Sequence, residues 1–412
     1  MGGRTDFGNV DLEKIAIEEL GDFDFSEIDF DFNEEFYRTD MKGFASWFLA
    51  KAFEKWNNIT GLEHLDDVPK DMPVAFVATH REHSDYLIHA LMLFNHPWSP
   101  PDRNYVKIAA GENLYLKLPH RFLPLLNIDK WIRWAGAFQV YRQGNKTEKE
   151  KTALQNRLAM YVAKLVNENE SILIYPDSGR AYSGRSRFNP GAMHLLSVGQ
   201  RISGKDLCIV PMATSYEKTP SDRYFKYFEE LKDIKKTRKP TLKENFDYYF
   251  FDWPGLFIHV LTRDLGNAYT NIGKPVILKA EDVPLTIKEI EKYSVRKNKR
   301  LQKECEKLVE VTSTALFCRA VKKMQEGQAG NDGKIYLPDL ISVITEERRN
   351  LQQAGARTGH VADSRNVAER AIGFLCSPCR RMIYNSQETV TVARQDVIDY
   401  YANNIAHFRT AR

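Results

Sequence analysis

Short apolar runs alternate with helical patterns over the middle of the chain. The apolar runs are only a few residues long and are typical of buried strands. The predicted strands cover residues 74–78, 105–109, 136–141, 171–175, 208–213 and 275–278. Helix patterns lie between them at residues 86–94, 148–168 and 190–203. This alternation predicts an α/β domain with a mixed, largely parallel sheet flanked by helices.

The two ends of the chain have different patterns. Residues 1–40 are acidic with Phe at intervals, which predicts either a poorly ordered tail or a segment that packs by its aromatic rings. Apolar residues at helical spacing predict an amphipathic helix over residues 41–60. From residue 286 the sequence is helical and highly charged, without strong strand runs. The predicted division is therefore an N-terminal tail (1–40), an α/β domain (41–285) and a helical C-terminal module (286–412).

The charge is divided unevenly along the 412 residues. The formal net charge is +4, but residues 1–40 carry 13 acids and 3 bases, and the remainder carries 56 bases and 42 acids. A basic body suits phosphate-bearing substrates or an anionic lipid surface. The sequence contains no signature of a nucleic-acid-binding module, so nucleic acid is not an expected partner.

Cysteine usage and hydropathy indicate the compartment. Five cysteines are too few for a disulfide framework in a chain of this length, so we expect a reducing compartment. Cys376 and Cys379 form a lone C-x-x-C pair without a second ligand pair, and no metal site is predicted. The sequence has no apolar run of about 18 residues, so no transmembrane helix is predicted. These features predict a cytoplasmic protein, with contact to a membrane face left open.

The strongest candidate chemistry lies between the strand at 74–78 and the helix that follows it. His80 and Asp85 are separated by four residues, and an aspartate can orient a histidine that removes a proton from a hydroxyl. The end of a strand is a common place for catalytic groups in α/β folds. The alternative is that Asp85 only caps the helix and that His80 is unrelated to it.

Three further segments follow in order. Arg142 comes after the run at 136–141 and could offer a planar fork to a phosphate, although taken alone it is more typical of a surface arginine. Asp177 precedes a turn in which Gly179 allows tight backbone geometry and Arg180 and Arg185 lie close together. The third segment, at 207–216, is an uncharged run with a proline at residue 211; Pro211 suits an acyl pocket or a core equally well.

The order of these segments resembles the four blocks of the glycerolipid acyltransferase superfamily, and more narrowly the bacterial membrane-associated glycerol-3-phosphate acyltransferases. The resemblance rests on H-x4-D at 80–85, G-A-F-x-x-x-R at 136–142, D-x-G-R at 177–180 and I-V-P at 209–211. Segments 109–114, 269–275 and 400–407 also fit that subfamily.

The resemblance implies transfer of a fatty acyl group from a thioester of coenzyme A or acyl carrier protein to the sn-1 hydroxyl of glycerol 3-phosphate. His80 is then the general base and Asp85 orients it. Arg142, Arg180 and Arg185 contact the phosphate, with Asp177 and Gly179 supporting the third block. No cofactor is implied beyond the acyl thioester. The implied location is the inner face of the cell membrane, where the enzyme binds peripherally to anionic lipid.

Two departures from the family pattern leave the acceptor open. Tyr141 and Tyr182 stand where the family often has arginine, and Arg81, Lys146, Arg185 or Arg187 are candidates to compensate. The alternatives are an acyltransferase that uses dihydroxyacetone phosphate or lysophosphatidate, and a non-catalytic protein that binds lipid or acyl carrier. Residues 114–134 and 246–257 mix bulky apolar residues with cations and are candidate membrane contacts, or else core elements.

Overall fold

The computed structural model of the chain describes most of its length. The described residues are 25, 28, 32–96, 105–111, 133–140, 147–177, 181–225, 265–327, 334–376, 383–386 and 388–409, together with isolated positions between 227 and 241.

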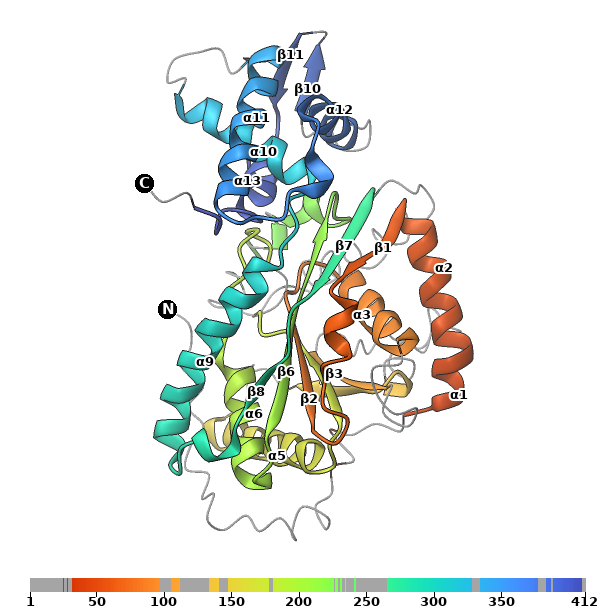
Figure 1. Cartoon of the computed structure of the whole chain (residues 1–412), viewed down its shortest axis with the longest axis vertical. Helices are drawn as coiled ribbons and strands as arrows, with labels where there is room; N and C mark the ends of the chain where they lie inside the picture. Colours follow the sequence, from red (N-terminus) through yellow and green to blue (C-terminus); the bar gives the residue numbers. More distant parts are fainter. Residues whose placement is uncertain are drawn as a thin grey trace.

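One mixed sheet forms the centre of the larger part of the molecule (Figure 1). Among the described residues it has eight strands, in the order β1-β7-β6-β2-β5-β3-β4, with β8 paired to β6 beside β7. The β1–β7, β6–β2, β2–β5, β5–β3 and β3–β4 pairs are parallel, whereas β7 and β8 run antiparallel to β6. The strands are β1 (Lys55–Thr60), β2 (Val74–Ala78), β3 (Val106–Gly111), β4 (Ala137–Val140), β5 (Ser171–Ile174), β6 (Leu207–Tyr216), β7 (Asn267–Ile272) and β8 (Val276–Leu278).

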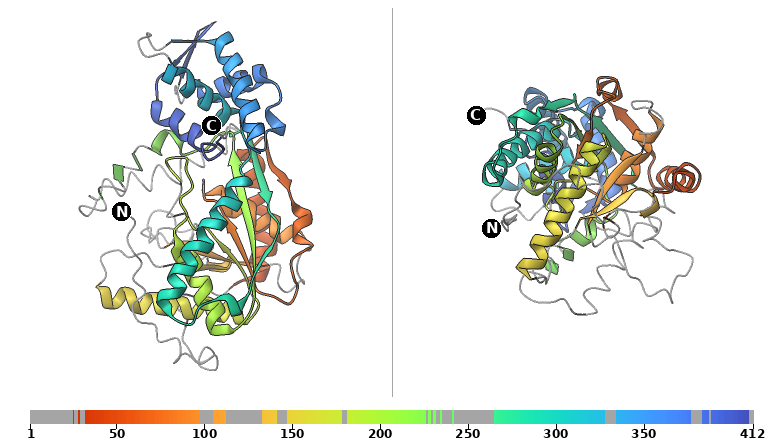
Figure 2. Two further views of the ribbon diagram at one scale, coloured as in Figure 1. Left: turned by 60° about the vertical axis from the view of Figure 1, so that its left-hand side comes forward. Right: turned by 90° about the horizontal axis from the view of Figure 1, so that it is seen from below.

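Helices cover both faces of this sheet, as the view from below shows (Figure 2). One layer consists of α5 (Glu148–Asn167), α6 (Pro190–Ser203) and α9 (Ile287–Lys307), with α6 packed between the other two. The other layer contains α2 (Lys42–Ala52), preceded by α1 (Glu34–Phe36), and α3 (Ser84–Asn95). The predicted fold class is confirmed: a mostly parallel sheet lies between helical layers.

The predicted helices at 148–168 and 190–203 match α5 and α6 to within one residue. The helix predicted for 41–60 is wrong in its second half, because the chain turns after Ala52 and forms β1. Residues Lys55 to Asn58 alternate between exposed and partly buried positions, as in an edge strand. Strand β7 was not predicted either, because buried Thr270 and Asn271 interrupt its apolar pattern.

Pro211 lies in the middle of β6, at the point where the neighbouring strand changes. Up to Ile209 the neighbour is β8, and from Met212 onward it is β7. In the gap between the two pairings, the Gly273 N–H donates to the Pro211 carbonyl over 2.8 Å. A Cβ at Gly273 would lie 2.8 Å from the Pro211 ring. A proline is tolerated in this inner strand because the ladder is already interrupted there.

The C-terminal residues form a second body at one end of the sheet (Figures 1 and 2). It contains α10 (Ser313–Gly327), α11 (Leu337–Gln353), α12 (Ser364–Leu375) and α13 (Gln395–Asn403). A three-stranded antiparallel sheet accompanies them, made of β9 (Lys334–Tyr336), β10 (Ile383–Ser386) and β11 (Thr389–Val392). These strands are an addition to the helical module that the sequence predicts. None of the described helices combines the length and apolarity that crossing a membrane requires.

The second half of the acidic N-terminal segment packs through its aromatic rings. Phe25 and Ile28 are buried in the core beside α5, and the Phe25 ring lies 5.5 Å from that of Tyr161. Tyr37 is buried against Phe94. Two alternatives were predicted for residues 1–40, and packing by aromatic rings holds for these positions. Most of residues 1–31 lie outside the described part. The predicted domain boundary at 285/286 stays a prediction, although α9, which follows it, packs on α6.

Candidate active site

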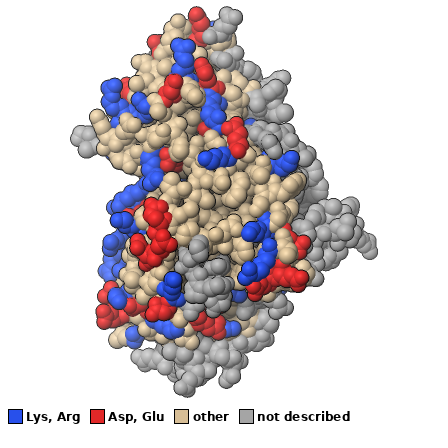
Figure 3. Space-filling view, turned by 45° about the vertical axis from the view of Figure 1, so that its right-hand side comes forward, with Lys and Arg blue, Asp and Glu red and all other residues tan. Residues whose placement is uncertain are grey.

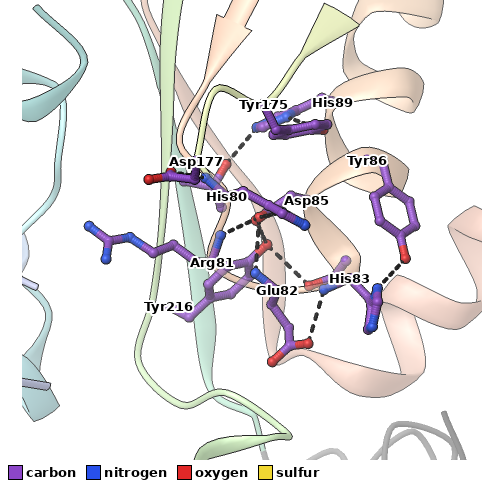
Figure 4. Close-up of polar contacts among 12 residues, drawn as sticks. His80, Arg81, Glu82, His83, Asp85, Tyr86, His89, Tyr175, Asp177 and Tyr216 are labelled. Atoms are coloured by element: carbon purple, nitrogen blue, oxygen red, sulfur yellow. Dashed lines mark hydrogen bonds and ion pairs between the residues drawn. The ribbon is translucent and has the colours of Figure 1, made fainter. Parts of the chain in front are cut away.

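The loop between β2 and α3 brings His80 and Asp85 into direct contact (Figure 4). His80 lies two residues after β2, and Asp85 lies in the first turn of α3. The His80 Nδ1 and Asp85 Oδ2 atoms are 2.9 Å apart. Asp85 does not cap the helix, because the N-cap residue is His83. The contact between the two side chains therefore favours the dyad over the alternative that Asp85 only caps the helix.

Asp85 is fully buried and is surrounded by donors. Its Oδ2 also accepts the backbone N–H groups of Arg81 and Glu82 over 2.6 and 3.0 Å, and its Oδ1 accepts the Tyr216 hydroxyl. Burial alone would raise the pKa of Asp85, but the hydrogen bonds and charges around it, led by His80, lower that pKa overall. A charged carboxylate at Nδ1 holds the imidazole as the tautomer with a proton on Nδ1. The Nε2 lone pair of His80 is then available to accept a proton.

The third block contacts the backbone of His80 from the other side. Asp177, just after β5, accepts the His80 N–H over 3.0 Å and the Arg187 N–H over 2.7 Å. The Ala181 N–H donates to the His80 carbonyl over 3.1 Å. Burial raises the pKa of Asp177, although its backbone hydrogen bonds oppose the shift. Asp177 therefore positions the peptide that carries the candidate base, and its carboxylate is used for that purpose.

Only some of the other predicted site residues lie in the described part of the chain. Arg142, Gly179 and Arg180 lie outside the described residues, as do Tyr141 and Lys146. Arg185 is exposed, and its Nε donates to Asn403 over 3.3 Å. Pro211 is buried in β6 against Gly273, so its predicted role in an acyl pocket stays a prediction.

The structure limits the candidates for replacing the missing arginines. Arg81 is 5% exposed, and its guanidinium donates to the Gly184 carbonyl and to Asn404, so it joins protein segments. Tyr182 packs with its ring 5.8 Å from Phe225 and 5.3 Å from Phe228. Arg185 and Arg187 are the exposed cations of the described part of the turn. One nitrogen of the Arg81 guanidinium is therefore bound to two protein groups, and compensation by Arg81 stays a prediction.

The C-terminal body contacts this same turn, a link that the sequence did not predict. Asn403 donates to the Ser183 carbonyl over 2.9 Å, and Asn404 accepts from Arg81 over 3.0 Å. Gly184 has a φ of +79°, and a Cβ there would lie 2.0 Å from the Tyr400 carbonyl oxygen. Segment 400–407, which fits the subfamily at the sequence level, is therefore part of the support of the candidate site.

Beneath the dyad lies a buried chain of hydrogen bonds that the sequence analysis also missed. The Tyr175 ring packs 4.8 Å from the His80 ring, and its hydroxyl is 3.0 Å from His89 Nδ1. His89 Nε2 lies 2.7 Å from the Thr214 hydroxyl, which contacts Thr270 over 3.0 Å. Burial lowers the pKa of His89 to about 4, so this imidazole is neutral and fixes the Tyr175 ring against His80.

The neutral state of His89 predicts loss of stability in acid. The unfolded chain protonates this histidine below a pH of about 6.5, whereas the folded chain resists protonation down to a pH of about 4. The unfolded state therefore binds the extra proton, and the free energy of unfolding falls by about 3 kcal/mol as the pH falls through this window. In His89→Gln we expect the fall between pH 6.5 and 4 to shrink by that amount, as measured by urea unfolding.

Two other histidines, one buried and one half-buried, keep part of the acid slope in that variant. Burial lowers the pKa of His194 and of His407 to about 4 as well. The matched control is His64→Gln, a change at a half-buried histidine outside the site, which measures the general effect of replacing histidine by glutamine. An acid slope in His89→Gln equal to that of the parent chain would contradict the assignment.

Tyr216 belongs to the candidate site, although the sequence did not predict it. The run at 207–216 is uncharged, but its last residue donates to Asp85 Oδ1 and accepts from the Ser84 hydroxyl over 3.1 Å. Burial and the neighbouring Asp85 raise the pKa of Tyr216 well above its usual value, so the phenol remains a donor. One feature of the sequence could have indicated it. Tyr216 is a polar residue at the carboxyl end of an inner strand, where sites form in α/β folds.

Loss of the Tyr216 hydroxyl should weaken the hold on Asp85. A hydrogen bond to a charged group contributes about 1.5–3 kcal/mol. In Tyr216→Phe we expect the pKa of Asp85 to rise, so the acidic limb of the kcat/KM profile should move to higher pH, with kcat reduced about tenfold. The control Ser84→Ala keeps the contact between Tyr216 and Asp85. An acidic limb that stays in place would show that Tyr216 only fills space.

Part of this chain is similar to known acyltransferases, which confirms the resemblance over the residues concerned. Residues 59–215 match the family model described as Acyltransferase. A glycerol-3-phosphate acyltransferase of Xanthomonas axonopodis pv. citri (strain 306) is 28% identical over 253 residues, which are 59% of this chain and 25% of that protein. One of Pseudomonas aeruginosa (strain LESB58) is 27% identical over 237 residues, 57% of this chain and 24% of that protein.

The chain spans about a quarter of the length of the curated relatives it matches. Among solved structures, the 1-acyl-sn-glycerophosphate (LPA) acyltransferase PlsC from Thermotoga maritima aligns with a TM-score of 0.33 and 14% identity, over 66% of this chain and 80% of that one. The description of the fold rests on the strand order and pairing given above. The matched segment 59–215 runs from β1 to β6 and contains both members of the dyad.

Proposed function

We propose that this acyltransferase-like chain is an O-acyltransferase that moves a fatty acyl group from an acyl thioester to the sn-1 hydroxyl of glycerol 3-phosphate. The observation that carries the proposal is the contact between His80 Nδ1 and Asp85 Oδ2, 2.9 Å long, within the matched segment. The acceptor is proposed from the names of the curated relatives, which are glycerol-3-phosphate acyltransferases.

The reaction follows from the tautomer that Asp85 imposes. The Nε2 atom of His80 takes the proton of the acceptor hydroxyl as its oxygen attacks the thioester carbonyl carbon. Asp85 stabilises the imidazolium that forms. The tetrahedral intermediate then expels the thiolate, which receives the proton from His80. An ester bond replaces the thioester bond, and no acyl-enzyme and no cofactor take part.

Cationic groups of the second and third blocks are proposed to hold the phosphate of the acceptor. Arg142, Arg180 and Arg185 are the proposed contacts, since a guanidinium fork matches phosphate oxygens. Asp177 and Gly179 support the turn that carries two of them, and Pro211 is proposed to lie near the acyl chain. With Tyr182 packed among aromatic rings, the proposed clamp depends on Arg180, Arg185 and Arg187 within this turn.

The acyl donor is proposed to be a thioester of coenzyme A or of acyl carrier protein. The proposed location is cytoplasmic and peripheral, on the inner face of the cell membrane, where the acyl product is delivered. Phospholipid synthesis is the process that uses such a product. Nucleic acid has no role in the proposal.

The proposal is tested by incubating the purified chain with labelled glycerol 3-phosphate and palmitoyl thioesters of both carriers. Formation of a labelled lysophosphatidate, dependent on chain concentration, is the expected result. Dihydroxyacetone phosphate and lysophosphatidate serve as competing acceptors in parallel reactions. Higher kcat/KM for either of these would replace the proposed acceptor, and no acyl transfer to any of the three would overturn the enzymatic proposal in favour of a binding protein.

A further inference from the structure

Helix α9 has one face in the core and one strongly basic face in solvent. Its buried side chains, Ile290, Tyr293, Leu301 and Cys305, face α6 and the sheet. The opposite face exposes seven cations: Lys288, Lys292, Arg296, Lys299, Arg300, Lys303 and Lys307. We call this face the α9 basic face.

The cations of the α9 basic face form one continuous stripe. Positions 288, 292, 296, 299, 303 and 307 follow one another at steps of three or four residues, so they lie on the same side of the helix. Between Lys292 and Lys303 the helix has six bases and no acid. At 1.5 Å per residue, the stripe from 288 to 307 is about 28 Å long.

Within the described residues, most of these cations form no ion pair with an acidic side chain. In the described part of the chain, Lys307 is the cation of this face that forms an ion pair, with Glu304. By contrast, Lys322 and Lys323 of α10 pair with Asp399, Glu346 and Glu347. Blue and red side chains are likewise interspersed over much of the face in Figure 3. The α9 basic face is therefore a concentration of uncompensated positive charge.

Exposed apolar side chains accompany the stripe. Five large hydrophobic side chains are exposed among the described residues, and two of them, Val295 and Leu285, lie on α9 or just before it. Val295, which is 39% exposed, lies between Lys292 and Lys299 on the helix, and Leu285, which is 66% exposed, lies two residues before the helix begins. Cations interleaved with exposed apolar groups are typical of a helix that lies on a membrane surface.

The same helix contacts the turn that supports the candidate base. Asn298 donates to the Phe188 carbonyl over 3.0 Å, and Gln302 donates to the Ser186 carbonyl over 3.2 Å. The neighbouring Arg187 N–H is bound by Asp177, which also accepts the His80 N–H. The side of α9 that faces the protein is thus linked to the backbone of His80 through this turn and Asp177.

We propose that the α9 basic face is the surface by which this chain docks on an anionic phospholipid membrane. The proposal rests on the proposed function, because an acylated product must pass from the dyad into lipid. The occupant follows from the stripe itself, since a long, straight row of cations with Val295 and Leu285 exposed matches a plane of anionic headgroups above acyl chains. The α9 basic face is therefore the membrane contact to test first, before the candidate segments 114–134 and 246–257.

The test measures binding of the full chain to sedimented vesicles of phosphatidylcholine alone or with 30% phosphatidylglycerol. One variant neutralises the stripe: Lys292→Gln, Arg296→Gln, Lys299→Gln and Lys303→Gln. A matched control removes four exposed cations of α2, β1, α11 and α12: Lys51→Gln, Lys55→Gln, Arg349→Gln and Arg365→Gln. Both changes lower the net charge by four, and thermal unfolding followed by circular dichroism identifies any variant that fails to fold.

The parent chain should bind the anionic vesicles and not the neutral ones. Since each surface cation contributes about a five- to tenfold factor, the stripe variant should lose about 100-fold or more in partition coefficient, and the control less than about tenfold. Equal losses in the two variants would overturn the proposal. So would parent binding that is the same for both vesicle compositions.

Two further measurements separate this proposal from its alternatives. Val295→Ser with Leu285→Ser should weaken vesicle binding further, and unchanged binding would remove the apolar part of the argument. If the stripe variant binds vesicles like the parent but has a raised KM for a carrier-protein thioester alone, the face docks an acidic carrier and the membrane proposal fails. Acyl transfer from a water-soluble short-chain thioester should persist in the stripe variant, so a parent chain inactive in that assay reports failure of the proposed function and not of the docking surface.

Discussion

We expect His80→Ala to lower kcat for acyl transfer by between about 100-fold and 10,000-fold, the range for loss of a general base. The reason is that the variant lacks the Nε2 atom that accepts the hydroxyl proton. In the parent chain Asp85 Oδ2 lies 2.9 Å from Nδ1 and holds the imidazole in place. The KM for both substrates should change little, because the imidazole acts in the transition state. Single-turnover and steady-state assays of the purified variant check both expectations.

The control for this variant is in the same loop. His83→Ala removes an imidazole that contacts the Tyr86 hydroxyl and not Asp85. We expect its kcat to fall by less than about tenfold. A His80→Ala enzyme with the parent turnover would remove His80 from the mechanism, and equal losses in both variants would point to damage of the loop.

We expect Gly184→Ala to separate the C-terminal body from the candidate site. An alanine Cβ would lie 2.0 Å from the Tyr400 carbonyl oxygen and 3.0 Å from Asn403 Cβ, so the turn or α13 must move. Together with the left-handed backbone at φ +79°, this contact should reduce the free energy of unfolding by about 3 kcal/mol. Chemical unfolding monitored by tryptophan fluorescence provides the measurement, and kcat should fall with it because Arg81 and Ser183 lose their partners.

Gly355 offers a matched comparison. It has the same φ of +79°, but no atom lies within 4 Å of the position of its Cβ. Gly355→Ala therefore carries the backbone cost alone, about 1 kcal/mol, and should leave kcat unchanged. If the two variants were equally stable and equally active, the contact between the turn and α13 would have no energetic weight.

The inner strands were predictable because burial on both faces makes their sequences continuously apolar. Strands β2, β5 and β6 were predicted to within a few residues at their ends for this reason. Strand β1 at the sheet edge continues the aromatic spacing of α2 and was taken for helix. Strand β7 carries Thr270 and Asn271 inside the protein, where hydrogen bonds to Thr214 and to the Leu308 carbonyl satisfy them.

The dyad was predictable for a different reason. Its two members lie on one short loop, so their contact depends on local geometry that sequence spacing already restricts. Tyr216 was not predictable in this way, because it comes from a strand 131 residues further along the chain. The same is true of Asn404, which reaches Arg81 across 323 residues.

The sequence by itself determined the α/β class, the place of His80 and Asp85 at the end of a strand, and the resemblance to acyltransferases. These properties depend on local periodicity and on the order of short segments. Only the tertiary structure decided how the dyad is supported, with Tyr216 on one oxygen of Asp85, Asp177 on the backbone of His80 and the C-terminal body behind the turn at 181–187. It also decided that Arg81 joins two segments inside the protein, because a buried guanidinium takes the partners that folding brings to it, and spacing along the chain does not show them.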